Sequence, residues 1–181
     1  MPNRMDVLLG AQWGDEGKGK YTDAIASNYD AIARFQGGPN AGHTIYVLTS
    51  DGQWVKVILH QICSGILADK LSISGDGMVI DPSKYLSEIK TVLGYKPLAY
   101  RLIKIAQNAG VILPVHILLD HINEFLAGSA KIGSTLCGIG PAYEEQTGRR
   151  GPKFREMLQE DAFEALSKLQ QRHLPLIQDA I

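Results

Sequence analysis

The glycine-rich stretch GAQWGDEGKGK, at Gly10 to Lys20, constrains the fold more than any other part of the chain. It directly follows the apolar run from Met5 to Leu9, and the segment after it, Lys18 to Ser27, can form a helix. A strand, a glycine loop and a helix in this order turn backbone N–H groups and a helix N-terminus toward phosphate oxygens. The stretch therefore predicts a phosphate-binding loop in an α/β fold.

The glycine loop departs from an ordinary P-loop in two respects. Gly14, Gly19 and Lys20 match the P-loop pattern, but Tyr21 stands where a Ser or Thr normally holds magnesium. Carboxylates also lie among the lysines, beginning at Asp15. A carboxylate there can ligate magnesium or accept a proton from a substrate. The alternative interpretation is a glycine turn with solvated charges.

A second loop, QGGPNAGHT at Gln36 to Thr44, follows the strand expected at Ala31 to Phe35. In an open α/β sheet, the loops at the carboxyl ends of neighbouring strands meet over one crevice. We therefore expect His43 to lie near Asp15, where the two form a plausible acid and base pair. The alternative is an ordinary hydrogen-bonded loop histidine. That simpler role is expected for the other four histidines, which are His60, His116, His121 and His173.

A third loop-like segment runs from Gly133 to Gly151 and contains Ser134, Thr135 and the pair Arg149-Arg150. Hydroxyl and backbone N–H groups can hold a phosphate, and an arginine can clamp one with two hydrogen bonds. A flexible surface loop with a solvated basic pair is an equally good interpretation.

Strand and helix patterns alternate along the chain, which favours a sheet covered by helices. Asp51-Gly52 predicts a hairpin turn, and Asp81-Pro82 predicts the start of a helix. Expected strands are Met5–Leu9, Ala31–Phe35, Thr44–Leu48, Trp54–Leu59, Leu71–Ser74, Met78–Ile80 and Val111–Val115. Expected helices are Lys18–Ser27, one opening at Pro82, Tyr100–Ala109, Ile117–Leu126 and Asp161–Gln171.

Composition excludes several function classes. The chain has 181 residues with 45% apolar content, which suits one domain spanning residues 1–181. Lysine and arginine total 18 against 19 acidic residues, so no nucleic-acid surface is expected. No apolar run is long enough for a membrane span. The two cysteines suggest no disulfide framework, and a cytoplasmic location is expected.

Together these segments resemble the adenylosuccinate synthetases, GTP-dependent ligases that join IMP and L-aspartate on the path to AMP. GAQWGDEGKGK, RFQGGPNAGHT, SGIL at Ser64 to Leu67 and GIGPAYEEQTGRRG at Gly138 to Gly151 come in the family's order and approximate spacing. The resemblance implies a P-loop-like α/β fold, with a mostly parallel sheet and flanking helices. It also implies that the fold is incomplete at the C-terminus, because family members are much longer.

The resemblance also implies a mechanism. Asp15 is the general base that removes the N1 proton of IMP, and the resulting 6-oxyanion attacks the γ-phosphorus of GTP to give 6-phosphoryl-IMP. Asp15 and the Gly42 carbonyl are the ligands of Mg²⁺. His43 is the acid that stabilises charge on the leaving GDP, and Lys18 steadies the transferring phosphoryl group. The amine of aspartate then displaces the 6-phosphate.

Two overlapping sets of binding residues follow from the resemblance. GTP phosphates with magnesium are assigned to Gly14, Asp15, Glu16, Gly17, Lys18, Gly19, Lys20, Gly42, His43 and Thr44. IMP is assigned to Asp15, Glu16, Gly17, Lys18, Asn40, Ala41, Gly42, His43, Thr135 and Arg149. The arginine in that position reaches the IMP of the neighbouring subunit, which implies a homodimer.

The sequence departs from the family pattern directly after Thr135. The family usually carries a glycine and an arginine there, whereas this chain has Leu136 and Cys137. That arginine helps to hold the carboxylate of aspartate, and neither replacement carries its charge. A non-catalytic nucleotide-binding module derived from the same fold is therefore the alternative function. An unrelated P-loop ATPase ranks last, because it needs a Ser or Thr at Tyr21.

Overall fold

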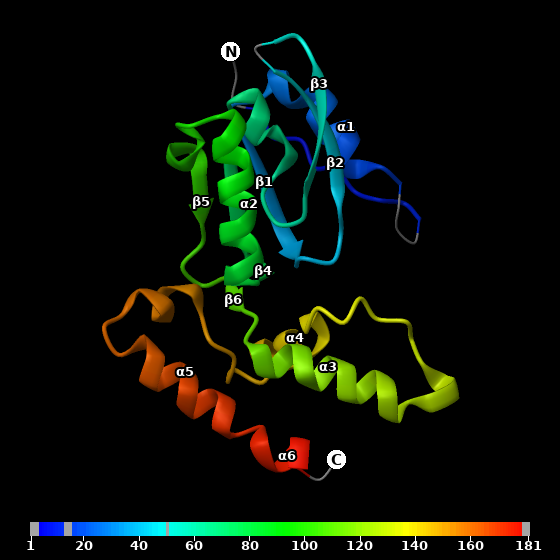
Figure 1. Cartoon of the computed structure of the whole chain (residues 1–181), viewed down its shortest axis with the longest axis vertical. Helices are drawn as coiled ribbons and strands as arrows, with labels where there is room; N and C mark the ends of the chain where they lie inside the picture. Colours follow the sequence, from blue (N-terminus) through cyan, green and yellow to red (C-terminus); the bar gives the residue numbers. More distant parts are fainter. Residues whose placement is uncertain (1–3, 13–15, 50, 179–181) are drawn as a thin grey trace.

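A small parallel sheet forms the centre of the chain. The computed structural model describes residues 4–12, 16–49 and 51–178. Strand β4 (Leu71–Ile80) pairs in parallel with β1 (Ala31–Gly37) on one side and β5 (Ile103–Ile105) on the other. The short β6 (Gly110–Val111) pairs in parallel with the end of β4 (Figure 1). The expected parallel sheet is confirmed.

A separate two-stranded hairpin lies beside this sheet. It consists of β2 (His43–Leu48) and β3 (Trp54–Leu59), which are antiparallel. The predicted turn is confirmed, since Gly52 takes a φ of +81° and donates its N–H to the Thr49 carbonyl at 3.0 Å. One face of the hairpin is apolar and buried, so β2 and the loop that precedes it are fixed against the core.

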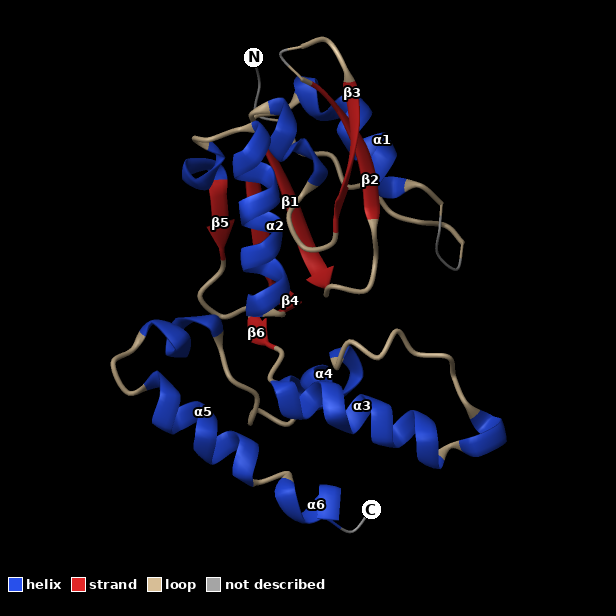
Figure 2. Ribbon diagram, in the orientation of Figure 1, coloured by secondary structure: helices blue, strands red, loops and turns tan. Residues whose placement is uncertain are grey.

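Helices flank the sheet and fill the lower half of the molecule (Figure 2). Their bounds are α1 Lys18–Ile25, α2 Pro82–Tyr95, α3 Pro114–Leu126, α4 Ile139–Thr147, α5 Ala162–Gln171 and α6 Leu174–Gln178. Helix α2 runs along the sheet, whereas α3 to α6 gather beyond the end of β6. The predicted cap of α2 is confirmed, because Asp81 Oδ1 accepts N–H groups of Ser83 and Lys84 at 3.0 and 3.1 Å.

The apolar core consists of an upper and a lower cluster and a third, smaller one that contains Val79, Ile112 and Ala142. The upper cluster lies between the hairpin, the sheet and α2 and includes Leu59, Met78 and Val92. A lower cluster around Val111 is covered by apolar residues of α3, α5 and α6. Phe154 packs against both clusters and so connects them.

The first predicted strand is wrong. Residues 4–10 have no regular secondary structure, and the side chains of Met5 and Leu9 are 87% and 69% exposed. A strand needs a neighbour to pair with its backbone groups. Within the part of the chain that the structure describes, no strand pairs with this segment, and β1 pairs only with β4.

Four further expectations need correction. The two strands expected over 71–74 and 78–80 are one continuous strand, β4, which runs through the glycines between them. The helix expected over 100–109 is a 3-10 turn (Ala99–Leu102) followed by β5, because this segment supplies the strand beside β4. The strand expected over 111–115 ends at Val111, since Pro114 already begins α3. The segment over 133–151 is loop-like only in part, because α4 begins at Ile139. Among the described residues, no helix has the length and apolar character needed to cross a membrane.

Candidate functional site

The glycine loop and the second loop meet at Gly19 and His43. Gly17 takes a φ of +79° at the N-terminus of α1, which only glycine adopts without strain. Gly19 then lies buried beneath the imidazole, and a Cβ placed on it would lie 2.6 Å from His43 Cγ. The missing side chain at position 19 is what allows the first turn of α1 to contact the start of β2.

Lys18 and Glu16 form an ion pair inside the glycine loop. Both side chains lie over Gly10, where a Cβ would come within 2.5 Å of Lys18 Nζ. The Lys18 side chain is still 44% exposed, so its ammonium is available to a ligand. Lys20 lies exposed in the first turn of α1. Gly14 and Asp15, which also belong to the predicted site, lie outside the described residues.

The environment of His43 favours the neutral imidazole. Burial lowers the pKa of His43 below its usual value, and the positive charges of Arg34 and Lys18, with His60, lower it further. A neutral ring at neutral pH acts as a hydrogen-bond donor and not as a fixed cation. It can therefore stabilise charge on a phosphate oxygen by donating an N–H.

Arg34 holds the second loop in place through hydrogen bonds to backbone carbonyl groups. The sequence analysis did not identify this residue. Its guanidinium donates to the carbonyl oxygens of Gln36 at 3.1 Å and Gly38 at 3.0 Å, and also to the carbonyl of His60. One side chain thus joins both ends of the segment that contains β2 and β3. It fixes the position of the loop that leads into His43.

Tyr143 of α4 anchors the same loop from the other side. Its hydroxyl accepts the Gly37 N–H at 2.8 Å and donates to the Gly77 carbonyl at 2.7 Å. Ile139 also packs against Gly38, where a Cβ would lie 3.0 Å from the Ile139 side chain. The third segment therefore supports the second loop through α4.

The other residues of the second loop that were assigned to ligands lie at or near its surface. Asn40 and Gly42 are exposed, and Ala41 and Thr44 are partly exposed. A Cβ on Gly42 would lie 3.4 Å from Ile58, so β3 limits the space behind this loop. Backbone groups and the amide of Asn40 can therefore be reached by a ligand from solvent.

Asp120 of α3 holds the loop that carries Thr135. Its carboxylate is buried and accepts Ser134 Oγ–H and the Gly138 N–H, both at 2.8 Å. Thr135 itself is exposed between these two anchors. Leu136 takes a φ of +52°, which costs a non-glycine residue about 1–2 kcal/mol, and this explains why a glycine suits the position.

The described contacts do not complete the predicted site. Arg149 follows α4 at the surface with a φ of +57°, and Cys137 Sγ accepts a hydrogen bond from Lys84 at 3.2 Å. In the described part of the chain, neither Thr135 nor Arg149 makes a hydrogen bond to the glycine loop or to the second loop. The structure thus joins the first two loops directly and the third only through α4.

Comparison with known proteins identifies the family. The family model described as adenylosuccinate synthetase matches residues 7–180. The chain belongs to the adenylosuccinate synthetase family. A synthetase of Flavobacterium johnsoniae is 48% identical over 174 residues, which is 96% of this chain and 40% of that relative. One of Pelotomaculum thermopropionicum is 46% identical, covering 88% and 36%.

Solved structures of the family share the fold. The fully ligated adenylosuccinate synthetase of Plasmodium falciparum has a TM-score of 0.83 and 36% identity, covering 94% of this chain and 39% of that one. A succinoaminodeoxyadenylate synthetase of cyanophage S-2L, bound to dGMP and to dATP as an energy donor, has a TM-score of 0.52 and 28% identity over 77% of this chain. The chain spans about 40% of the length of the curated synthetases that it matches.

Proposed function

We propose that this chain carries the phosphoryl-transfer part of an adenylosuccinate synthetase, which uses GTP to join IMP and L-aspartate and releases GDP and phosphate. The observation that carries the proposal is the contact between His43 and Gly19. This contact makes a single site of two loops, one rich in backbone N–H donors and lysines, the other bearing an imidazole. Such a site suits phosphate groups and the charge that develops when one is transferred.

The residue roles in this proposal follow the order of the reaction. Asp15 takes the N1 proton of IMP, and the 6-oxygen attacks the γ-phosphorus of GTP to form 6-phosphoryl-IMP. The ammonium of Lys18 is shared between Glu16 and the nucleotide. It neutralises charge on the phosphoryl group that is transferred. His43 donates an N–H to the leaving GDP. The amine of aspartate then replaces the 6-phosphate.

Mg²⁺ fits the chemistry of the donors assigned to it. The Asp15 carboxylate and the Gly42 carbonyl both offer oxygen, which this hard cation prefers. Gly42 precedes His43 in the loop that packs on Gly19, and Asp15 lies four residues before that glycine. When bound, the ion neutralises charge on the phosphate oxygens of GTP.

IMP binding is assigned to Asn40, Ala41 and Thr135, together with Arg149 across a homodimer. Thr135 and Arg149 are both exposed, which suits a ligand or a second subunit. Sedimentation at micromolar concentration tests the dimer, and a folded monomer contradicts the shared site. The free thiols of Cys63 and Cys137 support a reducing, cytoplasmic location.

A phosphate-release assay with the purified chain tests the proposed function. It is run with GTP, IMP and aspartate together, and then with each of the three omitted in turn. IMP-dependent release of phosphate from GTP supports it, and release that ignores IMP favours a different nucleotide-binding module. Arms with dGMP and dATP test the alternative that the cyanophage relative illustrates. We favour IMP and GTP because relatives named adenylosuccinate synthetase reach 48% identity, against 28% for the cyanophage enzyme.

A further inference from the structure

Helix α4 carries Tyr143 on the face that meets the sheet and Glu145 on the opposite face. Residues two positions apart in an α-helix lie about 200° apart around its axis. The Tyr143 hydroxyl accordingly bonds to β1 and β4, whereas the Glu145 carboxylate bonds to α3 and to the chain between α5 and α6. The first contact reaches the second loop, and the second holds the helix in place.

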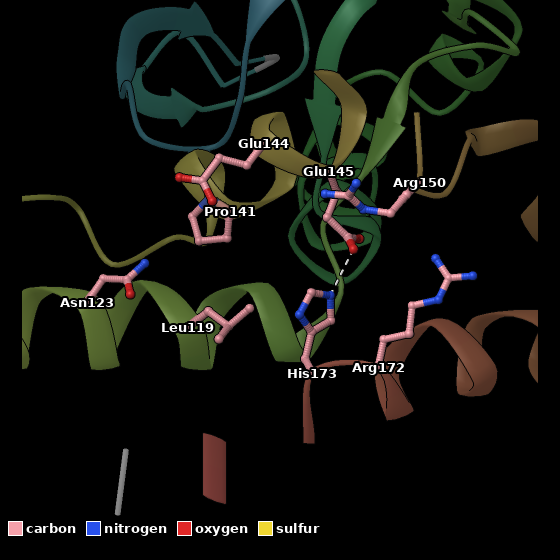
Figure 3. Close-up of a pocket in the computed structure, with 8 residues that line it drawn as sticks. All are labelled: Leu119, Asn123, Pro141, Glu144, Glu145, Arg150, Arg172 and His173. Atoms are coloured by element: carbon pink, nitrogen blue, oxygen red, sulfur yellow. Dashed lines mark hydrogen bonds and ion pairs between the residues drawn. The ribbon is translucent and has the colours of Figure 1, made fainter. Parts of the chain in front are cut away.

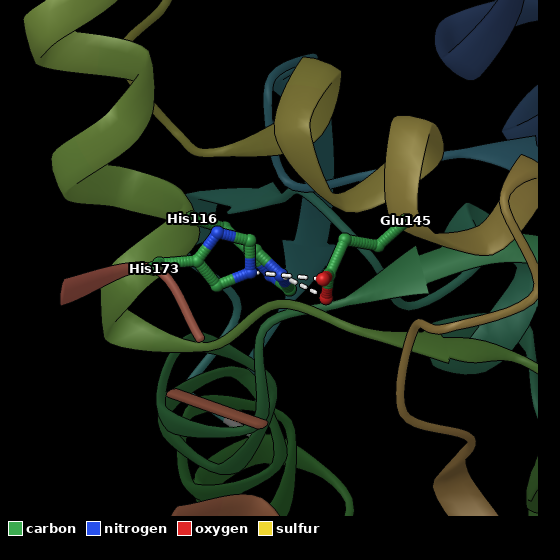
Figure 4. Close-up of side chains that lie close together, drawn as sticks. All are labelled: His116, Glu145 and His173. Atoms are coloured by element: carbon green, nitrogen blue, oxygen red, sulfur yellow. Dashed lines mark hydrogen bonds and ion pairs between the residues drawn. The ribbon is translucent and has the colours of Figure 1, made fainter. Parts of the chain in front are cut away.

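A polar cluster of His116, Glu145 and His173 holds α4 against the helices around it. Glu145 Oε2 lies 3.0 Å from His116 Nε2, and Oε1 lies 2.8 Å from His173 Nε2 (Figure 4). A pocket of about 360 Å³ lies beside this cluster and is lined in part by Glu145 and His173 (Figure 3). None of the residues that line the pocket belongs to the glycine loop or to the second loop. This face of α4 therefore supports the helix, and α4 acts on the second loop from its other face.

The N–H of Gly37 lies between two backbone carbonyl groups that Arg34 binds. The guanidinium donates to the carbonyl oxygens of the residues on either side of this glycine, at 3.1 and 3.0 Å. A guanidinium has no acceptor atom, so it cannot satisfy the N–H between them. The Tyr143 hydroxyl accepts the Gly37 N–H at 2.8 Å and donates its own proton to the Gly77 carbonyl at 2.7 Å. The site requires a group that both accepts and donates, which a phenol does.

This hydroxyl bridges β1 and β4 where their pairing is irregular. The register shifts between Arg34 and Gln36, and pairing resumes with Gln36 opposite Gly77. A Cβ on Gly77 would lie 2.4 Å from the carbonyl oxygen of Phe35, so the two strands approach closely here. Gly37, the last residue of β1, has a φ of +94°. Tyr143 thus binds the residue at which the chain leaves the sheet and enters the second loop.

A buried dipeptide, Gly38-Pro39, connects this anchor to the exposed part of the second loop. Ile139, about one helical turn before the tyrosine in α4, packs on Gly38, where a Cβ would lie 3.0 Å from its side chain. The ring of Pro39 fixes its own φ near about −65°. The path of the chain up to Asn40 is therefore set by contacts with α4 and has little freedom of its own.

The other end of the second loop is held by the hairpin. His43 begins β2 and pairs with Leu59 of β3, which lies in the apolar core. The ring of His43 packs on Gly19 so closely that a Cβ there would lie 2.6 Å from Cγ. Since the C-terminal end of the loop is fixed by β3, the anchor at Gly37 is the contact that decides how the loop presents this ring to the glycine loop.

We propose that the Tyr143 hydroxyl is a positioning group that holds the ring of His43 against Gly19, in the place from which it donates to the phosphate groups of a nucleotide. The inference rests on the proposed function in its choice of GTP as the ligand. Without the hydroxyl, the Gly37 N–H and the Gly77 carbonyl lose the partner that they share. A water molecule in its place would satisfy both groups but would not join them to α4.

Tyr143→Phe tests the positioning without a ligand, because it keeps the ring and removes only the hydroxyl. The measurement is the nuclear Overhauser effect between Gly19 Hα and His43 Hδ2 in the labelled 181-residue chain. We expect this effect to weaken in the variant while the chain stays folded. Tyr85→Phe is the matched control, since its hydroxyl also makes one side-chain hydrogen bond, to Ser74 Oγ at 3.0 Å, but lies in the core beside α2. It should lower stability and leave the Overhauser effect unchanged.

GTP affinity shows whether the hydroxyl acts through His43. Calorimetry should give about three- to tenfold weaker GTP binding in Tyr143→Phe, the range expected for one lost hydrogen bond, and no change in Tyr85→Phe. In a His43→Gln background, Tyr143→Phe should have no further effect, because the ring that it positions is absent.

Two results overturn the inference. One is an undiminished Overhauser effect between Gly19 and His43 in folded Tyr143→Phe. The other is an equal loss of GTP affinity in both backgrounds, because the hydroxyl then acts on other groups of the loop. A parent chain that binds no GTP contradicts the proposed function instead, and the Overhauser comparison between Tyr143→Phe and Tyr85→Phe still decides the positioning.

Discussion

The imidazole of His43 rests directly on the backbone of Gly19, with no space for a side chain between them. This one contact joins two loops through residues 19 and 43, which lie 24 positions apart in the sequence. It brings an ionisable ring to the first turn of a helix whose N-terminus can receive phosphate. It also explains why glycine is needed at position 19, although the φ of Gly19 does not lie in the left-handed region that favours glycine.

Gly19→Ala should therefore damage the site through His43. The added methyl would meet Cγ, Cδ2 and Cβ of His43 at 2.6 to 2.8 Å, and the ring must move. We expect a loss of about 1–3 kcal/mol in the free energy of unfolding from overpacking, and weaker GTP binding. Urea unfolding and calorimetry with GTP measure the two effects.

Gly94→Ala in α2 is the control, since nothing lies within 4 Å of its Cβ and it should stabilise the helix by about 0.5–1 kcal/mol. Unchanged GTP affinity in Gly19→Ala would contradict the role of this contact.

Asp15→Asn should abolish IMP-dependent phosphate release. An amide can neither accept the N1 proton nor ligate magnesium as an anion, and loss of a general base costs about 10²–10⁴-fold in rate. The measurement is phosphate release with saturating GTP, IMP and aspartate, in the form of the protein that shows this activity. GTP affinity without magnesium serves as the control and should change little. A variant within about tenfold of the parent rate would remove Asp15 from the role of base.

Local signals in the sequence were sufficient for much of the fold. Asp51-Gly52 specifies its hairpin, and Asp81-Pro82 caps its helix, because each signal acts on backbone groups only a few residues away. The run from Met5 to Leu9 shows the limit of such reasoning. Its apolar character predicted burial, but burial requires a neighbouring strand, and sequence pattern does not say whether one is present.

The supports of the candidate site could not be read from local pattern. Tyr143 joins Gly37 and Gly77, and the first of these bonds spans 106 positions. Glu145 likewise joins histidines that were expected to have only ordinary hydrogen bonds, and these bonds create the polar cluster beside the pocket. Motif spacing identifies residues that face a ligand, whereas residues that hold the loops act through contacts that only the tertiary fold creates.

Asp120→Asn should loosen the loop around Thr135. The asparagine oxygen can replace one acceptor, but its NH₂ group would face either Ser134 Oγ–H or the Gly138 N–H, where a second acceptor is needed. Loss of a buried hydrogen bond to a charged group costs about 1.5–3 kcal/mol. We expect that decrease in urea unfolding, together with faster amide exchange over residues 133–138.

The control for this variant is Asp76→Asn, at an exposed aspartate of β4 whose side chain makes no hydrogen bond or ion pair with the described residues. It should leave both the unfolding free energy and the exchange pattern unchanged. Normal exchange over residues 133–138 in Asp120→Asn would mean that the loop is held by other contacts, such as the Lys84 to Cys137 hydrogen bond.

Stability should fall as the pH drops below neutrality, because one buried and one partly buried histidine resist protonation. Burial is the main cause that lowers the pKa of both His43 and His116. Just below the ordinary histidine pKa of about 6.5, the unfolded chain therefore binds more protons than the folded chain. The free energy of unfolding must then rise with pH in that range. The contribution is fully present above about pH 6.5 and is lost as the pH falls toward the lowered folded-state values.

His116→Gln separates titration from packing in this pH dependence. The amide can accept the Leu113 N–H and donate to Glu145, as the ring does, but it does not ionise in this range. Urea unfolding between about pH 5 and pH 7.5 should show a shallower rise in stability for this variant than for the parent. His121→Gln, at an exposed position of α3, should keep the parent slope. Equal slopes in all three proteins would show that His116 is protonated as readily in the folded chain as in the unfolded chain.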